Sequence, residues 1–161
     1  MQLDKLFSVQ QELNERIVKE HSLDPHAIRK DKFLALLVEL GELANETRCF
    51  KYWSTKPPAP REKILEEYVD CLHFILTLGL DAGFTDIQPQ LQGQEMELTS
   101  HFINMFLGVN ELLSVSSRNS YEVLMEDFYS LGLALGFNGK EVEAAYMAKN
   151  EINHQRQDEH Y

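Results

Sequence analysis

Cysteine is scarce in this sequence. Among 161 residues only Cys49 and Cys71 are cysteines, and they lie far apart along the chain. No pair has the spacing of a zinc finger or a redox motif, and two cysteines cannot form the framework of a disulfide-rich domain. We therefore expect two reduced, buried thiols with no role in chemistry.

Basic residues are also few, and long apolar runs are missing. The chain has 15 Lys and Arg against 26 Asp and Glu, a formal net charge of -11. Duplex DNA and anionic membranes both favour clustered Lys and Arg, so the charge argues against either partner. No apolar stretch approaches the ~20 residues of a membrane span, and the N-terminus lacks a basic region followed by an apolar run. We expect a soluble, cytoplasmic protein whose acidic surface suits cations.

The pattern of apolar residues is helical in the first half of the chain. Within residues 3–18 apolar side chains recur at three- and four-residue steps, which predicts a helix ending near His21. Asp24 followed by Pro25 is typical of a helix start, so a second helix should run from there to about Cys49. Three prolines within residues 51–60 predict a non-helical linker. Helical periodicity returns over residues 61–81, and Gly83 should end that third helix.

The second half continues in the same way. Residues 84–93 contain Pro89 and Gly93 and indicate a loop, and residues 95–115, 121–135 and 140–155 predict three more helices. Residues 116–120 and 136–139 should separate these helices. A hydrophobic content of 43% is sufficient for one continuous core. The sequence predicts an all-α bundle of about six helices in a single domain over residues 1–161.

Two carboxylates interrupt an otherwise apolar stretch in the second predicted helix. Glu39 and Glu42 are three residues apart and therefore share one helix face. Paired acids on a helix usually form a solvated face. A helix that is apolar on almost every side is buried, however, and carboxylates rarely enter a core without a cation or a network of donors. Glu67 and Asp70 repeat this spacing at the edge of the next apolar run.

The two pairs predict a metal site. If the linker allows the second and third helices to pack antiparallel, the four carboxylates converge and their charge needs compensation. Hard oxygen ligands without a cysteine or histidine cluster select Mg²⁺ or Mn²⁺ over zinc, and Mg²⁺ completes its shell with waters and substrate phosphates. We therefore expect Glu39, Glu42, Glu67 and Asp70 to bind Mg²⁺, for which Mn²⁺ can substitute, and the substrate to be a phosphate ester.

The C-terminal segment carries an unexpected concentration of hydrogen-bond donors. Lys149, Asn153 and Arg156 follow one another at four- and three-residue steps and so line one face of a helix that can bind phosphate oxygens. An ordinary polar helix face is the alternative.

These residues together resemble a known family, the dimeric all-helical dUTPases of the MazG-like all-alpha NTP pyrophosphatase superfamily. The resemblance spans nearly the whole chain and rests on Gln10-Gln11-Glu12-Leu13-Asn14, Glu39-x-x-Glu42 continuing to Lys51-Tyr52-Trp53, Glu67-x-x-Asp70-x-x-His73-Phe74, and Lys149-Asn150-x-x-Asn153-x-x-Arg156-Gln157. Two departures are the final residues 158–161, which lack the glycine expected before the tyrosine, and residues 84–137, which match no motif.

The resemblance implies a reaction and a role for each matching residue. The reaction is Mg²⁺-dependent hydrolysis of dUTP, and often dUDP, to dUMP, with pyrophosphate released from dUTP. Glu39, Glu42, Glu67 and Asp70 would hold the metal, and Glu39 would also orient the attacking water. Gln11 and Asn14 would hydrogen-bond the uracil edge, Trp53 would wall the nucleotide pocket and Phe74 would sit against the deoxyribose. Lys149, Asn153 and Arg156 would hold the phosphates.

A homodimer is expected on two grounds. The resemblance implies it, and the fourth predicted helix carries more apolar residues than one packing seam needs: Phe102, Ile103, Met105, Phe106, Leu107, Val109, Leu112 and Leu113.

Several alternatives stay open at this point. A dCTP or broad-specificity pyrophosphatase would have the same reaction class, and a non-catalytic helical interaction module would require solvated acids. A ferritin-like di-iron protein needs Glu-x-x-His on each of two helices, and only Glu151-x-x-His154 is present. Gln11 and Asn14 are equally compatible with a solvated helix face, Trp53 and Phe74 with ordinary core, and His73 with a core histidine.

Overall fold

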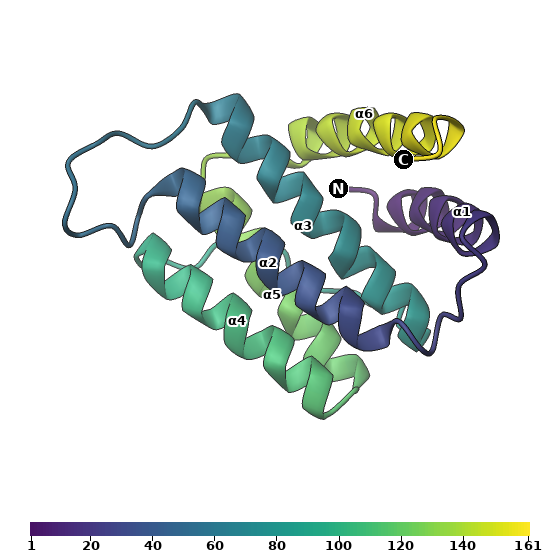
Figure 1. Ribbon diagram of the computed structural model, residues 1–161. Coiled ribbons are helices and arrows are strands. Elements are labelled where there is room, and N and C mark those ends of the chain that lie inside the picture. Colours follow the sequence, from purple (N-terminus) through teal and green to yellow (C-terminus); the bar gives the residue numbers. More distant parts are fainter.

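The computed structural model describes residues 1–161 and contains only helices, as the sequence predicts. Six α-helices follow one another along the chain (Figure 1): α1 (Leu3–Glu20), α2 (Arg29–Thr47), α3 (Arg61–Ala82), α4 (Leu98–Ser114), α5 (Arg118–Ala134) and α6 (Gly139–Asp158). The proline-rich residues 51–60 are non-helical, and Gly83 ends α3 with a positive φ of 74°. None of the helices is long and apolar enough to cross a membrane.

The predicted start of the second helix at Pro25 is wrong. The Asp24 side chain accepts a hydrogen bond from the backbone N–H of His26 (3.0 Å), and its carbonyl accepts one from Ala27 (3.1 Å). These bonds hold residues 25–28 in a separate turn, because an aspartate can satisfy nearby backbone donors without a helix. α2 begins after this turn, and Arg48 ends it in the left-handed region (φ 59°) before the predicted limit at Cys49.

Two further boundaries are set by helix caps. α5 begins at Arg118, earlier than predicted, because Ser117 and Ser120 form a reciprocal capping box. Two of the serines that predicted a loop at residues 116–120 therefore cap the start of α5. Asn138 and Glu141 form the equivalent box at the start of α6, whereas α4 begins only at Leu98 rather than at residue 95.

α3 is the central helix of the bundle. It packs along α2, and α1 and α6 lie on its other side, next to each other (Figure 1). α4 and α5 pair together and cover the remaining face, α4 against α2 and α5 against α3. Because α3 is enclosed on most sides, most of its residues from Glu67 to Gly79 are buried. The linker joins adjacent ends of α2 and α3, so these two helices run antiparallel.

Two buried tyrosines form hydrogen bonds between α3 and α5, and the hydroxyl of each lies close to a glycine. Tyr121 donates a hydrogen bond to the Ile75 carbonyl (2.9 Å), and Tyr68 donates one to the Phe128 carbonyl (2.8 Å). A Cβ atom added at Gly79 would lie 2.2 Å from the Tyr121 hydroxyl. Glycine is therefore required there for space, since it lets the tyrosine reach the helix backbone.

Both cysteines are free thiols. Cys71 is buried in the core as expected, but Cys49 is only half-buried, because it follows the end of α2 at the edge of the linker. The prediction of two buried thiols is wrong for Cys49.

A Gly79→Ala substitution should destabilise the fold by about 1–3 kcal/mol, because the added methyl group displaces the Tyr121 ring and its hydrogen bond. Gly41→Ala is the matched control: Gly41 lies in the exposed part of α2 with nothing within 4 Å of an added Cβ, so the change should stabilise by about 0.5–1 kcal/mol. Urea unfolding monitored by circular dichroism measures both. Equal unfolding midpoints for the two variants would contradict this explanation of the close approach.

Candidate active site

The antiparallel pair of α2 and α3 brings three predicted metal ligands together. Glu39 on α2 faces Glu67 and Asp70 on α3, and one carboxylate oxygen from each lies within 4.8 Å of the other two. Glu67 is buried and the other two are half-buried. The three-residue spacing within α3 puts Glu67 and Asp70 on one helix face, and helix pairing supplies the third carboxylate.

Glu42, the fourth predicted ligand, lies at the outer edge of this cluster. It is exposed, but it is close enough to Glu39 for its negative charge to raise the pKa of Glu39, in addition to burial and the charge of Asp70. Glu42 and Glu67 also line one open cavity of about 530 Å³ together with Lys63. The structure thus places Glu42 next to the three-carboxylate group rather than within it.

Glu39 is the least compensated member of the cluster. Its Oε2 atom is buried and has no hydrogen-bond partner. Burial first, and then the negative charges of Asp70 and Glu42, raise the pKa of Glu39 to about 7. A carboxylate in this position is unfavourable unless a cation or a proton joins it.

The donor set fits a hard divalent cation. The ligand atoms are carboxylate oxygens, which Mg²⁺ and Mn²⁺ prefer. Opposite ligands around Mg²⁺ lie roughly 4.2 Å apart, twice the metal–oxygen distance, so oxygens within 4.8 Å of one another need only small side-chain rotations to share an ion. Glu39 has a free ligand atom to offer, because its buried Oε2 has no hydrogen-bond partner.

Lysines flank the α3 side of the cluster. The Lys149 ammonium lies 3.0 Å from Asp70 Oδ2 and 3.2 Å from Glu66 Oε1, and Lys63 lies 2.7 Å from Glu67 Oε1. Burial raises the pKa of Asp70, and the bond from Lys149 opposes that rise. No lysine or arginine pairs with Glu39, so the α2 side of the cluster lacks a cation from the chain.

A cavity of about 290 Å³ opens beside the carboxylates, between α1, α3 and α6. Six of the predicted site residues line it: Glu39, Asp70, Phe74, Lys149, Asn153 and Arg156. The C-terminal donors therefore face the acids as their helical spacing indicates. Positive and negative groups occupy one cavity, as a phosphate–metal site requires.

Gln11, Asn14 and Trp53 are not among the residues that line this cavity, although Asn14 is hydrogen-bonded to two that are, Gln10 and Thr77. Gln11 is exposed and donates to Glu15 (2.9 Å), and Gln11 and Asn14 line another cavity of about 400 Å³ together with residues at the C-terminal end of α3. Trp53 is 64% exposed in the linker, where it packs edge-on against Tyr52. Their roles toward the nucleotide stay predictions.

A buried polar network lines the cavity instead, and sequence reasoning missed it. Gln10 Oε1 lies 2.6 Å from His73 Nδ1 and accepts a hydrogen bond from the Tyr146 hydroxyl (2.7 Å). Gln10 Nε2 donates to Asn14 Oδ1 (2.9 Å), which also accepts from Thr77 (3.2 Å). The available signal was the position of Gln10, which falls on the apolar stripe of α1 between Leu6 and Leu13.

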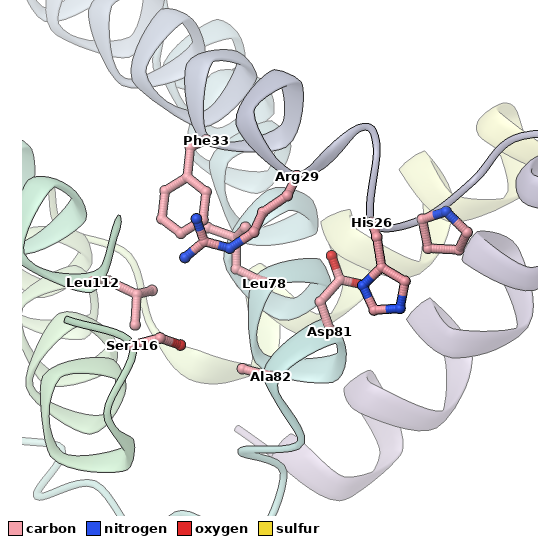
Figure 2. A pocket seen from close by; sticks show the side chains of 9 residues that line it. His26, Arg29, Phe33, Leu78, Asp81, Ala82, Leu112 and Ser116 are labelled. Atoms are coloured by element: carbon pink, nitrogen blue, oxygen red, sulfur yellow. The ribbon is translucent and has the colours of Figure 1, made fainter. Parts of the chain in front are cut away.

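A separate cavity of about 230 Å³ lies near the start of α2 (Figure 2), lined by His26, Arg29, Phe33, Asp81 and Leu112 among others. Arg29 stacks over the Phe33 ring (4.8 Å), and Asp81 is already paired with Lys32 (2.6 Å). This cavity adjoins the C-terminal end of α3, away from Glu67, and contains a single carboxylate. It has no group of ligands for a metal.

The Glu151-x-x-His154 motif of the di-iron alternative points elsewhere. Glu151 is exposed, and His154 Nδ1 lies 3.3 Å from an Arg16 guanidinium nitrogen. Neither belongs to the carboxylate cluster.

A family model described as dUTPase covers residues 2–161. No curated protein sequence matches the chain significantly.

Glu39→Gln should stabilise the protein in the absence of divalent cations. The substitution removes a partly buried charge that has no partner, and we expect a gain of about 1 kcal/mol after allowance for its partial exposure, or about 2–4 °C in Tm. Glu12→Gln, at an exposed position of α1, should leave Tm unchanged. Thermal unfolding in EDTA measures both, and a lower Tm for Glu39→Gln would show that the Glu39 charge is already compensated within the fold.

Proposed function

Because the chain belongs to the all-α dUTPase family and is a dUTP diphosphatase, we propose that it cleaves dUTP between the α and β phosphates on Mg²⁺ held by Glu39, Glu42, Glu67 and Asp70. The products are dUMP and pyrophosphate. The observation that carries the proposal is the buried, unpartnered Oε2 of Glu39 facing two further carboxylates. Mn²⁺ accepts the same oxygen ligands and substitutes.

Glu39 has the properties of a general base. A bound Mg²⁺ would neutralise phosphate charge and make the attacking water easier to deprotonate. Glu39 holds the water and takes its proton as the water oxygen attacks the α-phosphorus and the bond to the bridging oxygen breaks. Without a metal, burial and the neighbouring carboxylates raise the pKa of Glu39 to about 7, and a bound cation would keep the carboxylate deprotonated and able to accept the proton. Since dUDP has the same α–β linkage, the proposal extends to dUDP.

The donors of α6 hold the phosphates. The Lys149 ammonium already lies beside Asp70, so it can contact a phosphate oxygen that shares the metal. Arg156 and Asn153 lie further along the same face of the cavity, and Arg156 donates to Asn153 Oδ1 (3.4 Å). Phe74 is half-buried in the cavity wall, where an apolar ring suits a deoxyribose better than a ribose, whose 2′-hydroxyl it would leave unpaired.

Gln11, Asn14 and Trp53 can contact uracil as proposed only if they come closer to the nucleotide in the cavity. Gln11 and Trp53 are both exposed on the surface of this chain. Either a movement of the linker or a second copy of the chain would bring them to a nucleotide.

We propose that a second copy is present, as a homodimer. α2 and α4 pack against each other and expose large apolar side chains: Leu34 (61%), Val38 (51%), Ile103 (55%) and Leu107 (62%). Val38 also lines the cavity that contains Glu42 and Glu67, so this apolar surface adjoins the acids.

Alanine substitution of Glu39, Glu42, Glu67 or Asp70 should each reduce Mg²⁺-dependent turnover of dUTP by at least ~100-fold, because metal stabilisation of the phosphates contributes several kcal/mol. Pyrophosphate release from each canonical deoxynucleotide, with and without Mg²⁺, measures the effect. Glu12→Ala is the control and should retain the native rate. Near-native rates in any two of the four variants would refute the site.

Light scattering at micromolar concentration should give about twice the 18.7 kDa mass of one chain. Leu107→Glu should shift the protein toward monomer, since a charge in an apolar interface is costly, and Leu133→Glu on α5 should not. A wild-type protein that remains a monomer would contradict the dimer.

A further inference from the structure

A dUTP diphosphatase has to distinguish uracil from cytosine, and the two bases differ at N3. Uracil carries a hydrogen on N3 and donates there, whereas cytosine N3 is an acceptor. A site that presents a fixed acceptor to N3 therefore favours uracil, provided that the acceptor is buried and cannot exchange its role.

His73 provides a buried acceptor of this kind. The side chain is 6% exposed and lines the cavity next to Phe74. Its Nε2 atom is buried and has no hydrogen-bond partner. An unpaired polar atom in a folded protein calls for a partner from outside the chain, either a water molecule or a ligand.

Gln10 determines which nitrogen of His73 carries the hydrogen. The Gln10 amide donates through Nε2 to Asn14 Oδ1, so its Oε1 faces His73 and accepts from the Tyr146 hydroxyl as well. A carbonyl oxygen cannot donate, so His73 Nδ1 must be the donor in the 2.6 Å bond between them. In a neutral ring the other nitrogen, Nε2, then carries a lone pair.

The ring is neutral at physiological pH. Burial, and secondarily the positive charge of Lys149, lower the pKa of His73 to about 3. The ring also stacks on Tyr146 at 4.3 Å, which fixes its plane. Orientation and hydrogen position are thus both set by the fold.

We propose that His73 Nε2 accepts the hydrogen bond from uracil N3–H and so selects dUTP over dCTP, with Gln10 as the positioning residue. Cytosine would place a lone pair against the Nε2 lone pair. The inference rests on the proposed function and adds His73, as the partner of uracil N3, to the uracil contacts proposed for Gln11 and Asn14. The neutral part of the cavity around Gln10, His73 and Thr77 receives the base, while its charged residues Asp70 and Lys149 bind the phosphates.

The first test compares variants by their ratio of kcat/KM for dUTP and dCTP. Wild type should prefer dUTP by at least ~100-fold. His73→Asn keeps a donor for Gln10 but lacks Nε2, and the ratio should fall by at least ~10-fold, because the N3–H loses its partner. Gln10→Leu releases the ring and should lower the ratio as well, whereas Glu12→Ala, at an exposed position of α1, should leave it unchanged. An unchanged ratio in folded His73→Asn overturns the proposal.

A second test uses the wild-type protein alone and so does not depend on the folding of a variant. N3-methyl-dUTP cannot donate from N3 and should be turned over at least ~10-fold less efficiently than dUTP. The nucleotide's other donor is the 3′-hydroxyl, and 2′,3′-dideoxy-UTP removes it. If His73→Asn abolishes the effect of the 3′-hydroxyl instead of the effect of N3 methylation, the acceptor binds the sugar and the base assignment is wrong.

Nitrogen-15 NMR of the histidines provides a readout independent of turnover. His73 should show the Nδ1–H tautomer in wild type and lose this fixed tautomer in Gln10→Leu. Failure of the proposed function would appear differently: wild type would not hydrolyse dUTP with Mg²⁺ at all. Selective dUTP hydrolysis that is insensitive to His73→Asn and to N3 methylation overturns only the present inference.

Discussion

The mutual repulsion of carboxylates between α2 and α3 is the constraint on which the rest of the structure depends. Glu39, Glu67 and Asp70 bring oxygens within 4.8 Å of one another in a partly desolvated position, an arrangement that costs stability unless a cation joins it. The surrounding fold keeps the helices from separating: α3 is enclosed by α1, α2, α5 and α6, and Tyr68 and Tyr121 hydrogen-bond across to fix α5. Lys63 and Lys149 compensate the α3 acids, and Glu39 is left as the open position.

Charge is distributed unevenly around the cavity, and under the proposed function this would allow one small site to bind both ends of a nucleotide. Its charged part contains Glu39, Asp70, Lys149 and Arg156, which we propose bind the metal and the phosphates. Gln10, His73 and Thr77 provide neutral groups whose hydrogen bonds are mostly satisfied within the chain. The two proposals therefore assign reaction class and base selectivity to different residues, and substitutions at one end should leave the other largely intact.

Much of this site could be predicted from the sequence because polar residues at core positions are conspicuous. Glu39 and Glu67 interrupt apolar helices, and periodicity alone puts Lys149, Asn153 and Arg156 on one face. Periodicity shows which residues share one face of a helix, but not which other helix that face contacts. The sequence therefore predicted Gln11 at the site, whereas the packing of α1 on α3 places Gln10 in the cavity. The start of α2 was misplaced because the local hydrogen bonds of Asp24 compete with the helix.

The central claim is that the carboxylates of α2 and α3 form a divalent cation site. Crystals grown with Mn²⁺ and a non-hydrolysable dUTP analogue allow the most direct test, because Mn²⁺ gives an anomalous diffraction signal that locates the ion. The account predicts an anomalous peak in contact with Glu39, Glu67 and Asp70, with the analogue's phosphates on the side of Lys149. An anomalous map without a peak at these carboxylates, in a crystal that contains the bound analogue, would contradict it.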